Sequence, residues 1–459
     1  MANAHTQSEG HLLSWAGETR ALLALGLPLI GAQLAQIATG ITDTVMVGRL
    51  GAEPLAGLVL ASQLFFGLYL FGSGFTYGVL PLAANAVGAR DSRALRRSIR
   101  MGLWVLLLFS ALGVPILLNS ELIFLALGQD PAVTAIASDY LNIACLALPI
   151  GMIFMVLRAY LSALEAAQAV LYASIAGALL NVVLNYMLIF GNWGAPALGV
   201  QGAAIATVGT HGMMLAVSFW VVLKRADAAE HALFARLWRP DWEYFFKVLT
   251  IGAPVSATLL AEVGLFSGSA IIMGWIGTLE LAAHGIALQI VSVLFMLPYG
   301  LSQAGTVRLG LYDGIGASAR EAMRRVSLVS LGLTVAFSLT AALFLLSVPT
   351  PLVRLFLDAQ DVDTPQVIAF GVVLLAVAAA FQLVDSVQVV SAGLLRGLKD
   401  TTWPMVYAVF SYWVVGLPAA YVISIPWGFG PAGVWAGLAV GLTVAASTLT
   451  HRLWVRLRT

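Results

Sequence analysis

The segment "VIAFGVVLLAVAAAFQLV" (residues 367–384) has no charged residue and is long enough to cross the apolar core of a bilayer as one α-helix. Similar runs recur along the chain, in which 60% of the 459 residues are hydrophobic and only 10% are charged. Soluble globular domains carry about 25% charged residues, so this composition excludes a soluble enzyme, a disordered chain and a nucleic-acid-binding protein. The sequence therefore predicts a polytopic membrane protein.

Charged, Pro-rich and Gly-rich breaks divide the chain into twelve apolar runs, which we expect to be twelve transmembrane helices of an all-α protein. The first run is interpreted as a retained span, because no basic region and cleavage site mark a signal peptide. The expected helices are approximately 21–47, 55–80, 98–118, 132–157, 165–190, 198–223, 245–273, 279–305, 326–347, 365–391, 403–425 and 431–453.

The basic residues predict the orientation of these helices. With a cytoplasmic N-terminus, 21 of the 23 Lys and Arg residues fall on the cytoplasmic side, and only Arg49 and Arg354 fall outside. This asymmetry follows the positive-inside rule and predicts that both termini are cytoplasmic. We interpret the arginine cluster at 90–100 as part of this signal rather than as a lipid-binding patch.

The two halves of the chain resemble each other. With a shift of 226 residues, "GLPLIGAQLAQ" (26–36) aligns with "GAPVSATLLAE" (252–262), and with a shift of 234 residues "LSAL" (161–164) aligns with "LRGL" (395–398). Six helices per half give both halves the same orientation, which predicts parallel repeats with a cleft between them and a rocking motion about a central site. The predicted segments are a tail (1–20), an N-lobe (21–223), a cytoplasmic linker (224–244), a C-lobe (245–453) and a C-terminal tail (454–459).

Two pairs of polar or helix-distorting residues occupy equivalent positions in the repeat. Pro28 and Pro254 predict kinks in the first and seventh helices. Gln63 and Gln289 are candidate substrate contacts in the cleft, with buried amides that serve packing as the alternative.

Three acidic residues, Asp43, Glu262 and Asp385, lie inside predicted spans, where we expect no Lys or Arg to neutralise them. A carboxylate at a helix centre costs about 2.5–3.5 kcal/mol on the insertion scale. A bound cation, a bound proton or a water-filled cavity would offset this cost, and all three are features of coupled transporters.

Further oxygen ligands are available in the first half of the chain. Asn181 and Asn185 lie four residues apart and so share one helix face, and Thr207 follows in the next helix. With a carboxylate, these groups can form a sodium site or a proton relay, although interhelical hydrogen bonding explains them equally well. A single cysteine, Cys145, and the absence of phosphate-loop and hydrolase motifs give no support to an enzyme or to ATP-driven transport.

Three segments carry a resemblance to a known family. The sequences "TDTVMVGRLGAEPLAG" (42–57), "LAEVGLFSGSAIIMGWIG" (260–277) and "LVDSVQVVSAGLLRGLKDT" (383–401) resemble the multidrug and toxic compound extrusion (MATE) family, in its NorM-like branch. The resemblance covers essentially the whole chain. It implies a V-shaped transporter of two pseudo-symmetric six-helix bundles in the bacterial cytoplasmic membrane, working without a cofactor and as a monomer among membrane lipids.

The resemblance also implies a function and a set of site residues. The protein would export hydrophobic, often cationic drugs in exchange for Na⁺ or H⁺. Glu262 and Asp385 would bind the coupling cation, or Na⁺ as a metal ligand pair, while Asp43, Asn181, Asn185 and Thr207 would form the N-lobe site. Some relatives carry an acid where this chain has Asn185, which leaves Asp43 as the only N-lobe charge. A flippase for lipids or lipid-linked sugars is the alternative, and it would require a cationic cavity.

Overall fold

A computed structural model describes residues 13–357 and 363–458, and within these ranges every regular element is a helix. In these two ranges, eleven helices are long and apolar enough to cross a membrane. A twelfth span forms from α5 (Pro131–Ala144) and α6 (Ala147–Ala163), which are bent by 48° at the break between them. The prediction of an all-α protein with twelve transmembrane helices is confirmed.

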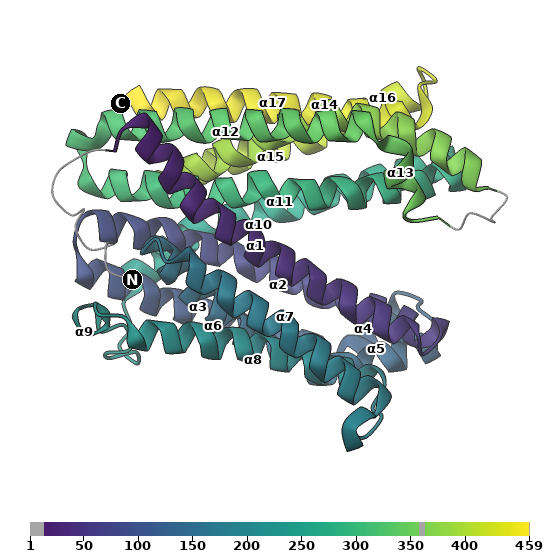
Figure 1. Ribbon diagram of the computed structural model, residues 1–459, viewed down its shortest axis with the longest axis horizontal. Coiled ribbons are helices and arrows are strands. Elements are labelled where there is room, and N and C mark those ends of the chain that lie inside the picture. Colours follow the sequence, from purple (N-terminus) through teal and green to yellow (C-terminus); the bar gives the residue numbers. More distant parts are fainter. Residues whose placement is uncertain (1–12, 358–362, 459) are drawn as a thin grey trace.

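The helices form two bundles, one from each half of the sequence (Figure 1). The N-bundle contains α1 (Trp15–Gly48), α2 (Ala52–Gly88), α3 (Ser92–Leu118), α4 (Ser120–Ala126), α5, α6, α7 (Ala167–Phe190), η1 (Asn192–Gly194) and α8 (Val200–Lys224). After the short α9 (Ala228–His231), the C-bundle contains α10 (Trp242–Ile276), α11 (Thr278–Ile315), η2 (Ala317–Ala319), α12 (Arg320–Ser347), α13 (Pro349–Arg354), α14 (Thr364–Gly397), α15 (Thr402–Val409), η3 (Phe410–Gly416), α16 (Leu417–Ser424) and α17 (Gly430–Arg458).

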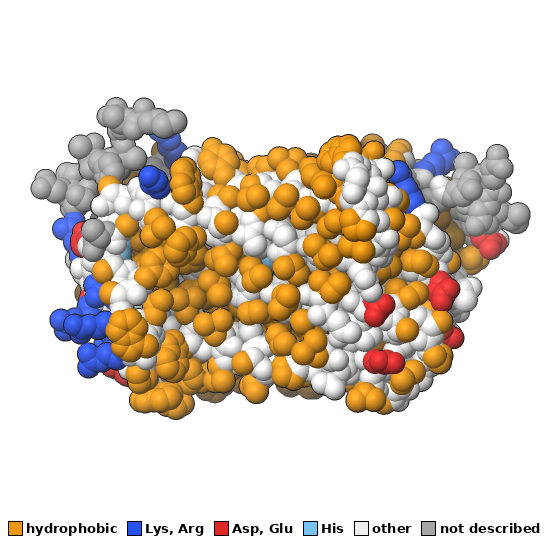
Figure 2. Space-filling model, turned by 90° about the horizontal axis from the view of Figure 1, so that it is seen from below, with side chains coloured by type: hydrophobic (Ala, Val, Ile, Leu, Met, Phe, Trp, Pro, Cys, Tyr) orange, Lys and Arg blue, Asp and Glu red, His pale blue; other side chains and the backbone are white. Residues whose placement is uncertain are grey.

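We call the face where α1 begins and α17 ends the terminal face, and the opposite one the far face. In Figure 1 the two bundles lie together at the terminal face, on the left, and diverge towards the far face, which gives the molecule its V shape. Figure 2 shows a broad apolar band, with most of the visible Lys and Arg side chains at the terminal end and most of the visible acidic side chains at the far end, where a few basic side chains also lie. An exposed apolar band of this kind is the surface that lipid chains cover.

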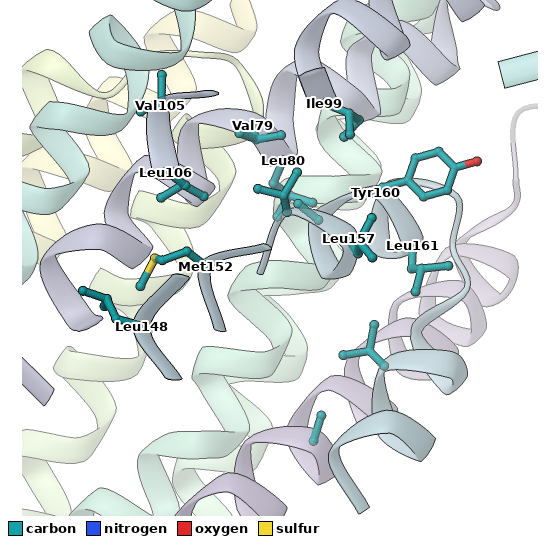
Figure 3. Close-up of a cluster of buried hydrophobic side chains, with 14 of the residues drawn as sticks. Val79, Leu80, Ile99, Val105, Leu106, Leu148, Met152, Leu157, Tyr160 and Leu161 are labelled. Carbon is teal, nitrogen blue, oxygen red and sulfur yellow. The ribbon is translucent and has the colours of Figure 1, made fainter. Parts of the chain in front are cut away.

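Each bundle has its own packed interior. The N-bundle core is formed mainly by α2, α3 and α6, where Leu80, Leu106 and Met152 are almost fully buried (Figure 3). The C-bundle core surrounds Trp435 and Phe381. Because lipid is as apolar as these side chains, the packing is held by close van der Waals contact rather than by exclusion of water.

The bundles meet where α2 packs against α10 and α11. Glycines allow the backbones to touch there: a Cβ atom at Gly88 would overlap the carbonyl of Leu311, and one at Gly74 would overlap Ser256. These contacts belong to the terminal halves of the helices. The terminal half is therefore the closed end of the V.

The segment between the bundles is anchored by ion pairs at the terminal face. Asp241 caps the N-terminus of α10 by accepting a hydrogen bond from the backbone of Tyr244. Arg97 on α3 holds the same carboxylate through two bonds of 2.5 and 2.9 Å. The bonds from Arg97 hold the pKa of Asp241 below its ordinary value of 3.8.

We predict that Asp241→Asn lowers the free energy of unfolding at pH 7 by about 1 kcal/mol, because it removes the ion pair and keeps the helix cap. A carboxyl group with a depressed pKa stabilises the fold above its unfolded pKa, and this contribution disappears as the pH falls through the folded pKa. Thermal unfolding in detergent between pH 2.5 and 7 should therefore show a weaker acid destabilisation in the variant. Equal pH profiles would contradict this role for the pair.

Candidate cation sites in the two bundles

In the N-bundle, Asp43 lies on α1 and is only 9% exposed. One of its carboxylate oxygens accepts hydrogen bonds from the side-chain amides of Asn181, at 3.0 Å, and Asn185, at 2.6 Å. Both asparagines come from α7 and are fully buried, and they are also bonded to each other at 3.1 Å. The four-residue spacing in the sequence thus places two amides on the helix face that meets Asp43.

Thr207 on α8 also lies near Asp43, and its hydroxyl donates a hydrogen bond of 3.1 Å to the backbone oxygen of Ala203. Its hydroxyl is 3.0 Å from the hydroxyl of Tyr140 on α5, a residue that the sequence analysis missed because a tyrosine in an apolar helix carries no distinguishing signal. The side-chain oxygen of Asn185 is buried without a hydrogen-bond partner. The four N-lobe residues therefore meet in space, and their carboxylate is already stabilised by amide donors.

In the C-bundle, Glu262 on α10 and Asp385 on α14 lie close enough to interact electrostatically. Asp385 is 3% exposed, and one of its carboxylate oxygens has no hydrogen-bond partner. No Lys or Arg of the described residues forms an ion pair with either acid. Tyr412, in the π-helical segment η3, is near both carboxyl groups and was also missed by the sequence analysis.

The two sites differ in what they can do chemically. The C-bundle acids are two like charges in a medium of low dielectric constant, so the pair favours a bound proton or another cation that reduces their repulsion. Carboxylate and phenol oxygens are also acceptable ligands for a hard cation. Within the described residues, no group of three or more His, Cys, Asp or Glu side chains could hold a metal ion, so a multivalent metal centre is not indicated there.

The other candidates from the sequence lie outside these two clusters. Gln63 on α2 and Gln289 on α11 are exposed, at the far halves of their helices. Pro28 and Pro254 lie inside α1 and α10, each of which continues past its proline as a single helix.

The contact between the bundles contains buried basic residues that the sequence analysis assigned only to the orientation signal. Arg158 on α6 is 5% exposed and donates to Gln33 on α1, at 2.8 Å, and to Gln303 on α11, at 3.0 Å. It bridges the two bundles through neutral amides. Arg158 lies one residue beyond the end of the predicted span 132–157, and α6 continues past it to Ala163, because a hydropathy criterion ends a span near a charged residue.

A second bridge is a buried ion pair. Arg308 on α11 forms hydrogen bonds of 2.9 and 3.0 Å with Glu18 on α1, whose side chain is fully buried. Arg308 also pairs with Glu165 at 2.6 Å, and the hydroxyl of Tyr312 donates to Glu18. This cluster closes the terminal face, since α1 and α11 belong to different bundles.

A model of a known family matches this chain twice, once in each bundle. The MatE family model matches residues 28–187 and 254–422, two segments whose starts are separated by the repeat distance found in the sequence. The chain belongs to the MatE family. MatE proteins are transporters rather than enzymes, and the resemblance noted from the sequence is confirmed.

Curated relatives of this MatE protein match over nearly their whole length. A probable multidrug resistance protein NorM of Rhizobium meliloti is 47% identical, covering 97% of this chain and 95% of the relative. The protein of the same name from Agrobacterium fabrum is 45% identical, covering 96% and 94%.

Solved structures share the fold of this MatE protein at lower identity. The structure described as the outward-facing conformation of a multidrug resistance MATE family transporter has a TM-score of 0.87 and 20% identity, with 96% of each chain covered. A mutant MATE structure has a TM-score of 0.86 with the same identity and coverage. These two structures establish the fold.

Proposed function

We propose that this protein is a secondary active multidrug efflux antiporter that exports hydrophobic, often cationic compounds in exchange for Na⁺ or H⁺. The observation that carries the proposal is the acid pair of the C-bundle, in which Glu262 is partly buried and Asp385 is buried, and with neither of which a Lys or Arg of the described residues forms an ion pair. The names of the relatives support multidrug efflux, and by itself the acid pair supports coupling to a cation.

We infer that the protein resides in the bacterial inner membrane with the terminal face in the cytoplasm. The basic side chains of this face support that orientation. The V would then open outward, away from the cytoplasm. The linker 224–244 connects the two bundles, which would act as the N-lobe and C-lobe of a monomer.

Alternating access follows from competition between the two ligands. A cation at Glu262 and Asp385 favours one arrangement of the bundles, and a drug bound between the bundles favours the other. Each ligand shifts this balance only by the difference between its affinities for the two states. No cofactor takes part in the cycle.

The direct test uses purified protein in proteoliposomes loaded with ethidium or norfloxacin. An inward Na⁺ gradient and an inward H⁺ gradient are imposed in separate experiments. We expect one of them to drive drug efflux, and the gradient that does so identifies the coupling ion. Absence of efflux under both gradients would overturn the proposal. Transbilayer movement of a fluorescent lipid or lipid-linked sugar in the same vesicles would favour the flippase instead, although the acids Asp43, Glu262 and Asp385 suit a cationic cargo better.

The N-bundle acid should make a smaller contribution to transport. We predict that Asp43→Asn lowers gradient-driven efflux about fivefold, because hydrogen bonds from Asn181 and Asn185 to a charged acceptor are worth about 1.5–3 kcal/mol and already stabilise this charge. Efflux rates in proteoliposomes check this value. Asp139→Asn, which neutralises an exposed acid of the same bundle, should leave the rate unchanged. Complete loss in Asp43→Asn would show instead that the N-bundle holds the principal coupling site.

A further inference from the structure

A stripe of four residues, three of them polar, runs along α14 from the acid pair to the terminal face. Its members are spaced by three, four and four residues, so they share one face of the helix. They are Asp385, Gln388, Ala392 and Arg396. With a rise of 1.5 Å per residue, the stripe spans about 16 Å. The stripe ends at the turn between α14 and α15, which contains Asp400 and lies at the terminal face.

A cavity of about 30 Å³ lies beside this stripe, between α10, α14, α15 and α17. A cavity needs roughly 10–15 Å³ and several polar partners to hold a water molecule. This one has polar groups from the side chains of Thr258, Gln388, Arg396, Asp400 and Thr401. The size and lining of the cavity therefore suit bound water. Asp400 and Thr401 belong to the turn at the terminal face.

At the end of the cavity nearer the far face, Tyr412 connects Gln388 to the acid pair. The side-chain amide of Gln388 donates a hydrogen bond of 2.8 Å to the hydroxyl of Tyr412. Because this hydroxyl is an acceptor in that bond, its own proton remains available for a second acceptor. The acids whose charges act on Tyr412 are Glu262 and Asp385, and Asp385 has an unpartnered oxygen. Tyr412 lies in the π-helical segment η3, and such distortions are frequent at functional sites.

At the end of the cavity nearer the terminal face lies the positive charge of Arg396, which contacts a residue of the N-bundle. The guanidinium of Arg396 lies 4.7 Å from the ring centroid of Tyr77 on α2, and the Arg396 side chain is almost completely buried. In the described ranges no carboxylate forms an ion pair with Arg396. A fixed guanidinium in a narrow passage repels cations. Separation of the bundles at the terminal face would remove the Tyr77 ring and release this side chain.

The charged groups of this stripe are not repeated in the N-bundle. With the repeat shift of 234 residues, Asp385, Arg396 and Asp400 align with Gly151, Ser162 and Ala166. The two halves thus differ in these charges, although they share their helical plan.

We propose that the C-bundle contains a hydrated route along α14 by which the coupling cation leaves Glu262 and Asp385 for the terminal face, and that Arg396, held by Tyr77, is its gate. This route lies inside one bundle, apart from the path of the drug between the bundles. The gate ties cation release to separation of the bundles, which prevents a leak while the terminal face is closed. The proposal rests on the proposed function in taking the acid pair as the coupling site.

The first experiment measures the gate without any drug. Proteoliposomes loaded with a pH-sensitive or a Na⁺-sensitive dye receive an imposed gradient of H⁺ or of Na⁺. We expect Arg396→Gln and Tyr77→Leu to increase the dissipation of one of these gradients at least tenfold. Tyr77→Phe keeps the ring, and Arg324→Gln neutralises an exposed arginine on α12, so both should remain as tight as the parent protein.

The second experiment measures the route directly in a Cys145→Ala background, which is free of cysteine. Cysteines are introduced singly at Ala392, beside the cavity, and at Ala378, a fully buried position on the same helix. Protection by Ag⁺ against later alkylation is then measured by mass spectrometry. We expect the Ala392→Cys thiol to react slowly with Ag⁺ when Arg396 is present and at least tenfold faster with Arg396→Gln. The Ala378→Cys thiol should stay unreactive in both.

Two outcomes would overturn the proposal. One is an Ala392→Cys thiol as unreactive as Ala378→Cys in both backgrounds, which would show a dry cavity. The other is a folded Arg396→Gln protein that holds both gradients as well as the parent, with Tyr77→Leu equally tight. Failure of the parent protein to expel drug under either gradient would count against the proposed function. The gradient-dissipation and Ag⁺-protection measurements do not depend on drug efflux, so the two failures can be told apart.

Discussion

Neutralising the C-bundle acids should abolish the coupling between the cation gradient and drug efflux. In Asp385→Asn and in Glu262→Gln, the repulsion that favours cation binding is removed, so the driving force no longer reaches the drug. A membrane potential of 100 mV contributes about 2.3 kcal/mol per charge moved. Loss of one coupled charge should therefore lower the steady-state drug gradient about 50-fold, since about 1.4 kcal/mol corresponds to a factor of ten.

This prediction requires that drug binding survives the substitutions. Equilibrium binding of ethidium to the purified variants should stay within about twofold of the parent protein, while efflux in proteoliposomes falls. Glu53→Gln provides the matched control, because it neutralises an exposed acid in the first turn of α2. Full gradient-driven efflux in both acid variants would eliminate Glu262 and Asp385 as the coupling site.

The second large effect is expected at the ion pair that closes the terminal face. In Arg308→Gln, the carboxylate of Glu18 stays fully buried and loses its charged partner. Breaking one partner of a buried pair costs about 3–5 kcal/mol. Because Glu18 and Arg308 lie in different bundles, part of this cost can be avoided by opening the terminal face. The balance between closed and open states should therefore move by about two to three orders of magnitude.

Pairs of spin labels at the terminal ends of α1 and α11 would report the opening as a longer distance, and thermal unfolding would report the loss of stability. The double variant Glu18→Gln with Arg308→Gln should recover much of the closed state, because no buried charge is left without a partner. Arg225→Gln breaks a partly exposed pair with Asp227 inside one loop, and should cost less than about 1 kcal/mol. Equal behaviour of Arg308→Gln and Arg225→Gln would contradict a closing role for the buried pair.

Much of the fold could be predicted because hydropathy is local. Each of the twelve predicted spans corresponds to a helix or a broken helix within the described residues, with ends that differ by up to ten residues, and the tenth span, expected at 365–391, corresponds to α14. The helices of the structure extend further, into charged residues that a hydropathy criterion removes. The expected span 403–425 contains the π-helical segment η3, for which the sequence offered no signal, and which packs against α17 and α10.

The candidate sites were predictable in part. Asp43 could be linked with Asn181 and Asn185 because i and i+4 positions share a helix face and a family resemblance supplied the partner helix. Tyr140 and Tyr412 could not, because an aromatic residue in an apolar span is indistinguishable from ordinary packing.

The sequence by itself determined the membrane class, the number of spans, the repeat and the three acids within the spans, since each of these depends on residue type and spacing alone. Only the tertiary structure decided which groups meet. It placed Arg158 against two glutamines from different bundles and Arg308 against Glu18, and it set Gln388 between Tyr412 and a cavity. These contacts depend on the rotation and depth of one helix relative to another. A pattern along a single helix shows which face is polar, and the packing determines what that face meets.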